Sequence, residues 1–278
     1  MEYIICYINL KKIQKKQLKI LLEFDRICDK HDIKYILFAG TLLGAVRHNG
    51  FIPWDDDIDV ALLRKDYKKF IQVCKNDLKE NYFLQTFNSD REYNKQFAKL
   101  RENNTTYLEK NMSECNIHHG LFIDIFPLDN VKPNTLLGKF QQKSCYFLYA
   151  FETIRIKKNC NNINNLIKQY LALILHFITL LIPETISNRV YYYLLNFFNK
   201  KNTKYISHLT NNPTKKKFHR FLIEKQELDE IIFSNFEGYK FPIPKNYNKI
   251  LKKIYNDYMS YPPKEEQKPR HNINEIKI

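Results

Sequence analysis

The segment Leu121–Phe126 limits most strongly what this chain can fold into. It reads LFIDIF, which is nearly continuous apolar sequence, and Pro127 follows it directly. A run of this length and composition is typical of a strand that is covered on both faces. Proline cannot donate a hydrogen bond to a neighbouring strand, so we expect the strand to end at Pro127.

Asp124 is the one charged residue inside this buried run. A carboxylate that is buried without a partner costs several kcal/mol, so Asp124 must have one. Two partners fit: a metal ion held jointly with other acids, or an arginine or lysine in a structural ion pair. Taken alone, Asp124 does not decide between them.

Asp57 and Asp59 form a second acidic feature, and Val60–Leu63 follows them as apolar sequence. Side chains two apart on a strand point the same way, with alpha carbons roughly 6.6 Å apart. Two such carboxylates repel each other unless a cation lies between them, and oxygen ligands suit Mg²⁺ or Mn²⁺. A solvated acidic turn is the alternative. The buried sequence after Asp59 favours the metal, and beside this pair Asp124 becomes a third candidate ligand. Asp55, two residues before Asp57, would point the same way, but it lies next to the Pro53–Trp54 turn and its direction is less constrained.

A candidate phosphate site precedes the acidic pair. Tyr35–Phe38 reads as a short strand, Gly40 and Thr41 as a turn, and the following apolar residues as a short helix. Glycine allows a phosphate to approach the backbone, and a helix N-terminus offers free N–H groups. Thr41 is a candidate helix cap or phosphate ligand. Arg47 is a candidate phosphate clamp, with an ordinary surface role as the alternative.

Basic residues suggest further phosphate contacts. Lys99 and Arg101 share parity on an expected strand, where they face either a phosphate or solvent. Lysine and arginine number 45 against 30 acids, a formal net charge of +15. This excess suits a phosphate-bearing partner, an anionic membrane surface or nucleic acid. A composition rich in lysine, asparagine, isoleucine and tyrosine would produce the same charge, so charge alone decides nothing.

The remaining pattern places the other elements. Helical periodicity covers 11–30, 66–78 and 247–258, a hairpin is expected to turn at Glu237–Gly238, and the tail from Pro262 is polar and expected to be loose. Leu171–Ile182 is apolar but too short to span a bilayer, so we interpret it as a core helix, with an interfacial membrane helix as the alternative. The N-terminus lacks the features of a secretion signal, and the scattered cysteines suggest neither zinc nor disulfides.

Four segments carry a resemblance to a known family. They are residues 38–59 (FAGTLLGAVRHNGFIPWDDDID), 97–101 (FAKLR, followed by Asn104–Thr106), 120–129 (GLFIDIFPLD) and 255–259 (YNDYM). These closely resemble the LicD family of phosphocholine transferases. The resemblance runs from about residue 15 to residue 271 and is weakest across 136–230. Asn256 departs from it, because the family pattern leads us to expect glycine there.

The resemblance implies a nucleotidyltransferase-like α/β fold, with a mixed sheet flanked by helices. It implies a CDP-alcohol donor, with CDP-choline favoured, and transfer of phosphocholine to a hydroxyl of a glycan or glycolipid with release of CMP. Asp57, Asp59 and Asp124 match the family's acidic metal ligands. The pattern and the resemblance together lead us to expect a catalytic core over 1–135, a mainly helical variable region over 136–233, and a C-terminal hairpin and helix over 234–278 that pack back on the core.

Two other functions remain open from the sequence. The first keeps the fold but transfers a nucleotide, releasing pyrophosphate in place of CMP. The second is a basic protein without catalysis that binds RNA or a membrane. Clustered acids disfavour an anionic partner, so we expect no nucleic-acid ligand. We expect a cytoplasmic protein, with peripheral contact at the inner face of the membrane as an option.

Overall fold

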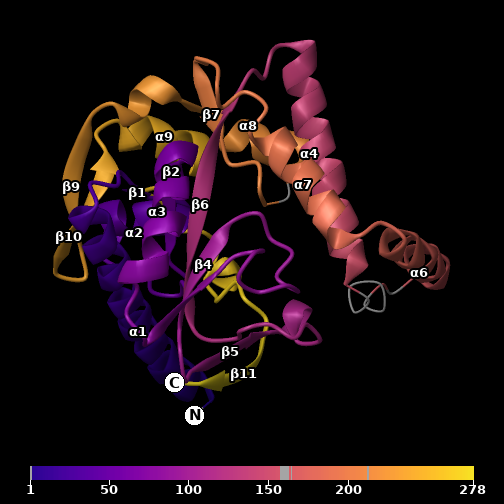
Figure 1. Cartoon of the computed structure of the whole chain (residues 1–278). Helices are drawn as coiled ribbons and strands as arrows, with labels where there is room; N and C mark the ends of the chain where they lie inside the picture. The colour runs from indigo at the N-terminus through magenta and orange to yellow at the C-terminus, as the bar shows by residue number, and fades with distance from the viewer. Residues whose placement is uncertain (1, 157–162, 164, 212) are drawn as a thin grey trace.

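The computed structural model describes residues 2–156, 163, 165–211 and 213–278, and its centre is a curled 7-stranded mixed sheet (Figure 1). The main path runs β1–β2–β6–β4–β3; β7 pairs with β6, and β8 pairs with β7. Strands β2 and β6 are parallel, and the other neighbours are antiparallel. The strands are β1 (Ile36–Leu37), β2 (Asp59–Leu63), β3 (Tyr82–Gln85), β4 (Ala98–Glu102), β6 (Phe122–Val131), β7 (Tyr205–Ser207) and β8 (Ile223–Glu224). The expected mixed α/β fold is confirmed.

Strand β6 is the axis of the sheet and is longer than predicted. All ten of its residues are buried, and it continues through Pro127 to Val131, so the expected end at Pro127 is wrong. The reason lies in its neighbours. Strand β4 pairs with residues 122–125 and β7 with residues 129–131. Pro127 falls between the residues that pair with β4 and those that pair with β7. Its missing N–H therefore removes no backbone hydrogen bond to either strand.

Helices α1 (Glu2–Lys30) and α3 (Arg64–Asp77) pack against the sheet and each other. Both predicted helices are confirmed, and α1 begins earlier than expected. Their apolar side chains recur at helical spacing, and the Phe24 and Phe70 rings meet with centroids 4.7 Å apart. Helix α2 (Ala39–His48) begins directly after β1. The expected turn at Gly40–Thr41 is therefore part of the first helical turn.

The region predicted to be mainly helical contains α4 (Leu136–Arg155), α6 (Leu166–Leu180), α7 (Glu184–Leu195) and α8 (Lys215–Arg220). It also supplies β7 and β8, which extend the central sheet. The apolar run Leu171–Ile182 is not a core helix: it falls largely within α6, whose leucine and isoleucine side chains are mostly exposed. Among the described residues no single helix is long and apolar enough to cross a bilayer, whereas α6 and α7 meet that measure only as a pair bent by 92°.

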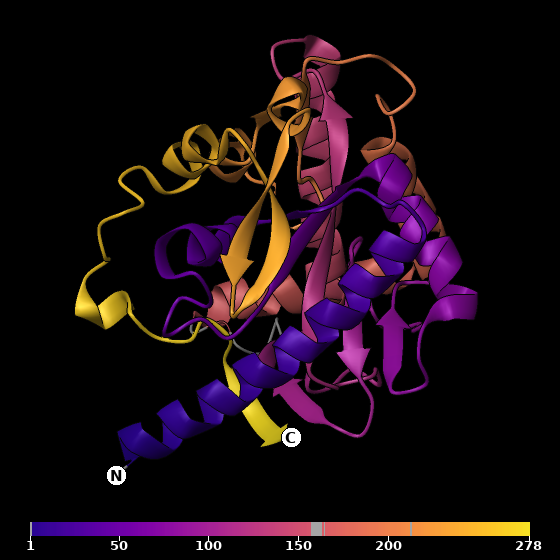
Figure 2. The same cartoon turned by 90° about the vertical axis from the view of Figure 1, so that its left-hand side faces the viewer.

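The C-terminal part is ordered, contrary to the expected loose tail. Strands β9 (Ile231–Phe236) and β10 (Tyr239–Pro244) form the predicted hairpin, and α9 (Tyr247–Tyr255) follows. The chain then runs around the outside of the molecule (Figure 2) and ends in β11 (Ile273–Lys277). Strand β11 pairs with β5 (Thr106–Glu109), more than 150 residues away, as its register shows. Short 3-10 helices in the described part of the chain lie at Lys110–Met112, Lys225–Leu228 and Lys264–Glu266.

Asn256 ends α9 with φ 59° and ψ −113°, a conformation suited to glycine. This explains why the family pattern leads us to expect glycine there. Asn256→Gly should raise the free energy of unfolding by about 1 kcal/mol, because it relieves backbone strain. Urea denaturation measures this. Lys252→Gly, inside the same helix, should lower it by about 1 kcal/mol. Equal losses from both substitutions would contradict the strain at Asn256.

Candidate active site

Asp59 and Asp124 lie side by side at the centre of the sheet. Asp59 opens β2, and it is the register partner of Asp124 on the parallel strand β6. Neighbouring strands are about 4.8 Å apart, so the two side chains share one face. Asp57 precedes the strand by two residues. These three residues and Asp55 line one cavity of about 690 Å³, and we call the four carboxylates the acidic cluster.

The carboxylates of the acidic cluster repel one another, and nearby cationic groups offset this repulsion only in part. Burial raises the pKa of Asp57 to about 6, with His271 opposing the shift. Burial, together with the Asp57 and Asp124 carboxylates, raises the pKa of Asp59 well above its usual range. Asp124 Oδ1 is buried and has no hydrogen bond. Buried and half-buried oxygen ligands that repel one another are the arrangement that a divalent cation stabilises, so these residues fit Mg²⁺ or Mn²⁺.

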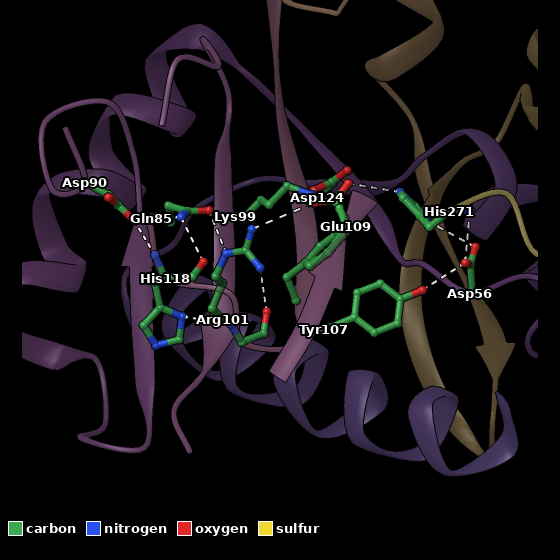
Figure 3. Close-up of polar contacts among 12 residues, drawn as sticks. Asp56, Gln85, Asp90, Lys99, Arg101, Tyr107, Glu109, His118, Asp124 and His271 are labelled. Carbon is green, nitrogen blue, oxygen red and sulfur yellow. Dashed lines mark hydrogen bonds and ion pairs between the residues drawn. The ribbon is translucent and has the colours of Figure 1, made fainter. Parts of the chain in front are cut away.

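Asp124 also has a protein partner. Lys99 Nζ lies 3.0 Å from Asp124 Oδ1, an ion pair without hydrogen-bond geometry, and 3.5 Å from Glu109 Oε2 (Figure 3). The same Nζ lies 3.1 Å from the centre of the Phe122 ring. Both partners that the sequence left open for Asp124 are therefore compatible with its position. A carboxylate accepts several bonds, so the lysine does not prevent a metal contact.

Arg101 is engaged within the protein. Its guanidinium donates to Gln85 Oε1 at 2.6 Å and to the Gly120 carbonyl at 2.5 Å, and the residue is 1% exposed. Neither Lys99 nor Arg101 is part of the described wall of the cavity. Lys99 pairs with Asp124, and Arg101 bonds to neighbouring parts of the sheet. Neither residue is placed to contact a ligand in that cavity.

Gly40 and Arg47, predicted to contact phosphate, do line the cavity. A Cβ at Gly40 would lie 2.8 Å from Asp55 Oδ2, so glycine permits the close approach of α2 to the acidic cluster. Arg47 donates to the carbonyls of Tyr258 (2.7 Å) and Ser260 (3.1 Å). Its guanidinium thus holds the C-terminal segment against the cavity.

Thr41 is buried, and its hydroxyl accepts a hydrogen bond from the backbone N–H of Asp59 at 2.7 Å. Through this bond Thr41 fixes the backbone of Asp59 and so the place of its carboxylate in the acidic cluster. Thr41→Val should leave that N–H unpaired, lower the free energy of unfolding by about 1–3 kcal/mol and reduce kcat by displacing Asp59. Denaturation and steady-state kinetics measure the two effects. Thr41→Ser keeps the acceptor and should restore most of both; a serine variant as impaired as the valine variant would contradict this role.

Two buried glutamines that were not among the predicted site residues hold the loop that carries Asp55 and Asp56. Gln14 Nε2 donates to the Asp55 carbonyl, and Gln17 Nε2 donates to the Asp56 carbonyl, each at 2.8 Å. Both glutamines lie on the buried face of α1. Two glutamines on an otherwise apolar helical face are a signal in the sequence. A buried amide needs a hydrogen-bond partner, so such residues indicate a contact with another part of the chain.

Asp56 joins the C-terminus to the active site. Its carboxylate accepts bonds from Tyr107 Oη (2.9 Å), the N–H groups of Arg270 and His271 (3.2 Å each), and His271 Nδ1 (3.1 Å) (Figure 3). Burial would raise the pKa of Asp56, but the bonds from His271 and Tyr107 lower it. Asp56, Asp57 and His271 lie close enough together to form a further possible metal-ligand group. The contacts from Arg270 and His271 span more than 200 residues, so no local pattern predicts them.

Three basic residues line the same cavity as the acidic cluster and were also missed: Lys217 and Arg220 on α8, and Arg270 in the C-terminal segment. Burial lowers the pKa of Lys217, and the Asp59 carboxylate opposes that shift. The run Lys215–Arg220 was a visible signal in the sequence. Cationic side chains and carboxylates in one cavity suit an anionic ligand whose charge is shared with a metal.

Comparisons with known proteins agree with this geometry. Residues 32–144 match the family model described as LicD/FKTN/FKRP, nucleotidyltransferase domain. Lipopolysaccharide cholinephosphotransferase LicD of Haemophilus influenzae is 29% identical over 267 residues, which cover 95% of this chain and 96% of that protein. Uncharacterised proteins of Rickettsia typhi and Rickettsia prowazekii are 42% identical over 55 residues and 36% identical over 76 residues.

The two Rickettsia matches are short. They cover 20% and 27% of this chain, and 18% and 27% of the respective proteins. The family match, in contrast, includes the strands that carry Asp59 and Asp124 and the loop that carries Asp57. Residues 32–144 of this chain are therefore a nucleotidyltransferase domain of the LicD family.

Proposed function

We propose that this chain is a metal-dependent transferase of the LicD type. It passes phosphocholine from CDP-choline to a hydroxyl of a glycan or glycolipid and releases CMP. The main observation behind this proposal is that the acidic cluster and the basic residues Lys217, Arg220 and Arg270 line the same cavity. The likeness to a lipopolysaccharide cholinephosphotransferase along 95% of the chain supports the choice of phosphocholine and of a glycolipid acceptor.

The cavity residues divide into ligands for a metal and ligands for phosphate. Asp57, Asp59 and Asp124 are the proposed metal ligands, because they line one cavity and repel one another. A bound Mg²⁺ or Mn²⁺ would supply positive charge to the diphosphate of the donor and to the departing CMP. Lys217, Arg220 and Arg270 are the proposed phosphate ligands. Phosphoryl transfer depends mainly on such positioning and charge neutralisation.

The proposed reaction is a single displacement at phosphorus. The acceptor hydroxyl oxygen attacks the phosphorus atom of the phosphocholine group, and the bond from that phosphorus to the oxygen of CMP breaks. The hydroxyl proton passes to a carboxylate of the acidic cluster.

The same cavity offers groups that suit choline. Trp54, Tyr255 and Tyr261 line it, and the Trp54 and Tyr261 rings lie 6.0 Å apart between centroids. Two further carboxylates, Asp257 and Glu266, are also in its wall. Aromatic faces and carboxylates together attract a quaternary ammonium. This combination favours a choline-bearing donor over a ribitol- or glycerol-bearing one.

The identity of the released product tests the proposal. The protein is incubated with Mg²⁺, lipopolysaccharide and either CDP-choline or CTP, and the soluble products are separated by chromatography. We expect CMP from CDP-choline together with choline bound to the lipopolysaccharide. Pyrophosphate from CTP, with no CMP from CDP-choline, would replace the proposal with nucleotide transfer. Asp29→Asn, at an exposed acid on α1, serves as the matched control for substitutions in the acidic cluster.

A further inference from the structure

The buried side chains of helix α6 are polar, and most of its large apolar side chains are exposed. Its two buried residues are His176 and Thr179. His176 Nδ1 lies 3.2 Å from the Ile154 carbonyl of α4. On the outer face, Leu166 is 80% exposed, Tyr170 69% and Phe177 62%. An amphipathic helix of a water-facing surface has the opposite arrangement, so this outer face is built for an apolar surrounding.

Large apolar side chains are also exposed on two neighbouring helices. Helix α6 packs against α4, and α7 also packs against α4. In Figure 1, α4 leads away from the sheet, and α6 lies at its far end. Large apolar side chains are exposed on α4 at Leu136, Phe140 and Phe147, and on α7 at Ile186 and Tyr193. We call α4, α6 and α7 with their exposed side chains the apolar arm.

The charges on the apolar arm are all of one sign. Lys139 and Lys143 on α4, Lys168 on α6 and Arg189 on α7 are exposed. Within the described residues of these three helices no exposed side chain is acidic, because Glu152 is buried and Glu184 is half-buried. An exposed apolar surface with basic residues among it is complementary to a surface that is apolar beneath an anionic layer.

We propose that the apolar arm docks onto the surface of a bilayer that contains anionic phospholipids. Its apolar side chains enter the boundary between headgroups and acyl chains, and its basic side chains contact the lipid phosphates. A second copy of the chain fits less well. A two-fold interface between apolar arms would bring Lys139, Lys143, Lys168 and Arg189 toward their own copies, with no exposed acid to pair with them. The bilayer supplies the negative charge that the arm lacks.

Vesicle flotation tests the proposal with the full chain and without any substrate. We expect binding to vesicles of phosphatidylcholine with phosphatidylglycerol, and much weaker binding to phosphatidylcholine alone. Leu171→Gln with Phe177→Gln should weaken binding roughly tenfold or more, because two exposed apolar groups are lost. Ile232→Gln with Phe233→Gln, at two exposed apolar residues of β9, is the matched control and should bind like the wild type.

A second pair of substitutions separates charge from apolar contact. Lys139→Gln and Lys143→Gln should each weaken binding to the anionic vesicles about fivefold, with little effect on phosphatidylcholine vesicles. Wild type that stays free of anionic vesicles would overturn the proposal, as would full binding by the α6 variant. A dimer in light scattering without lipid, abolished by Leu171→Gln with Phe177→Gln, would overturn it in favour of a second copy. Circular dichroism checks that the variants are folded.

Discussion

Asp59→Asn is expected to lower kcat for phosphocholine transfer by roughly 1,000-fold, because it removes a metal ligand at the centre of the acidic cluster. Asparagine has almost the same shape, so the register between β2 and β6 should survive. The remaining acids would bind the metal weakly and would leave charge on the diphosphate uncompensated. Release of CMP from CDP-choline at saturating Mg²⁺ measures the effect. Activity within a few fold of the wild type would remove Asp59 from the site.

The same substitution should make the protein without metal more stable. The raised pKa of Asp59 means that its ionised form is unfavourable in the folded state. The carboxyl therefore contributes stability below pH about 4, near its unfolded pKa, and loses that contribution as the pH rises. In EDTA at neutral pH, Asp59→Asn should raise the free energy of unfolding by roughly 1 kcal/mol. Asp29→Asn should change neither kcat nor stability; an equal gain there would contradict the cluster's repulsion.

Asp129→Leu should be the most destabilising of these substitutions, lowering the free energy of unfolding by about 3–5 kcal/mol. Asp129, on β6, accepts two bonds from the buried Arg64 of α3: Nε to Oδ1 at 2.7 Å and Nη2 to Oδ2 at 2.5 Å. Asn199 Nδ2 also donates to Asp129 Oδ1 at 2.6 Å. Loss of the carboxylate would leave a buried guanidinium without its counter-ion. Urea denaturation followed by far-UV circular dichroism measures the change.

The double variant Arg64→Met with Asp129→Leu is the control for that prediction. It removes both charges, so no buried charge is left without a partner, and it should recover a large part of the lost stability. A double variant as unstable as Asp129→Leu would mean that packing, and not the unpaired charge, accounts for the loss. Asn199 would still lack its acceptor, so full recovery is not expected.

The central sheet and the acidic pair were predictable because their signals are local. Apolar runs and helical periodicity identified β6, α1, α3 and α9, and the adjacent acids identified Asp57 and Asp59. The register that places Asp59 beside Asp124 is not local, and only the need of a buried carboxylate for a partner and the family resemblance pointed to it. The metal itself stays a prediction, as do the boundaries at 135 and 233.

The rest of the site depends on contacts between distant parts of the chain. Nothing near Asp56 in the sequence indicates that His271 returns to it, and a polar tail by itself favours a loose segment. Pro127 stayed within β6 because its neighbouring strands leave a gap there, which no proline rule foresees. The apolar run of α6 was assigned to the core because the sequence pattern shows that a helix has an apolar face. The pattern does not show whether other parts of the protein cover that face.

Thermal unfolding with CDP-choline, in the presence of Mg²⁺ or of EDTA, tests the central claim most directly because it needs no acceptor. CDP-choline at 100 times its dissociation constant should add about 2.7 kcal/mol of apparent stability. We predict this stabilisation with Mg²⁺, a loss of it in EDTA and in Asp59→Asn, and retention in Asp29→Asn. Stabilisation by CTP or ATP but not by CDP-choline, or equal stabilisation with and without metal, would contradict a metal-dependent phosphocholine transferase.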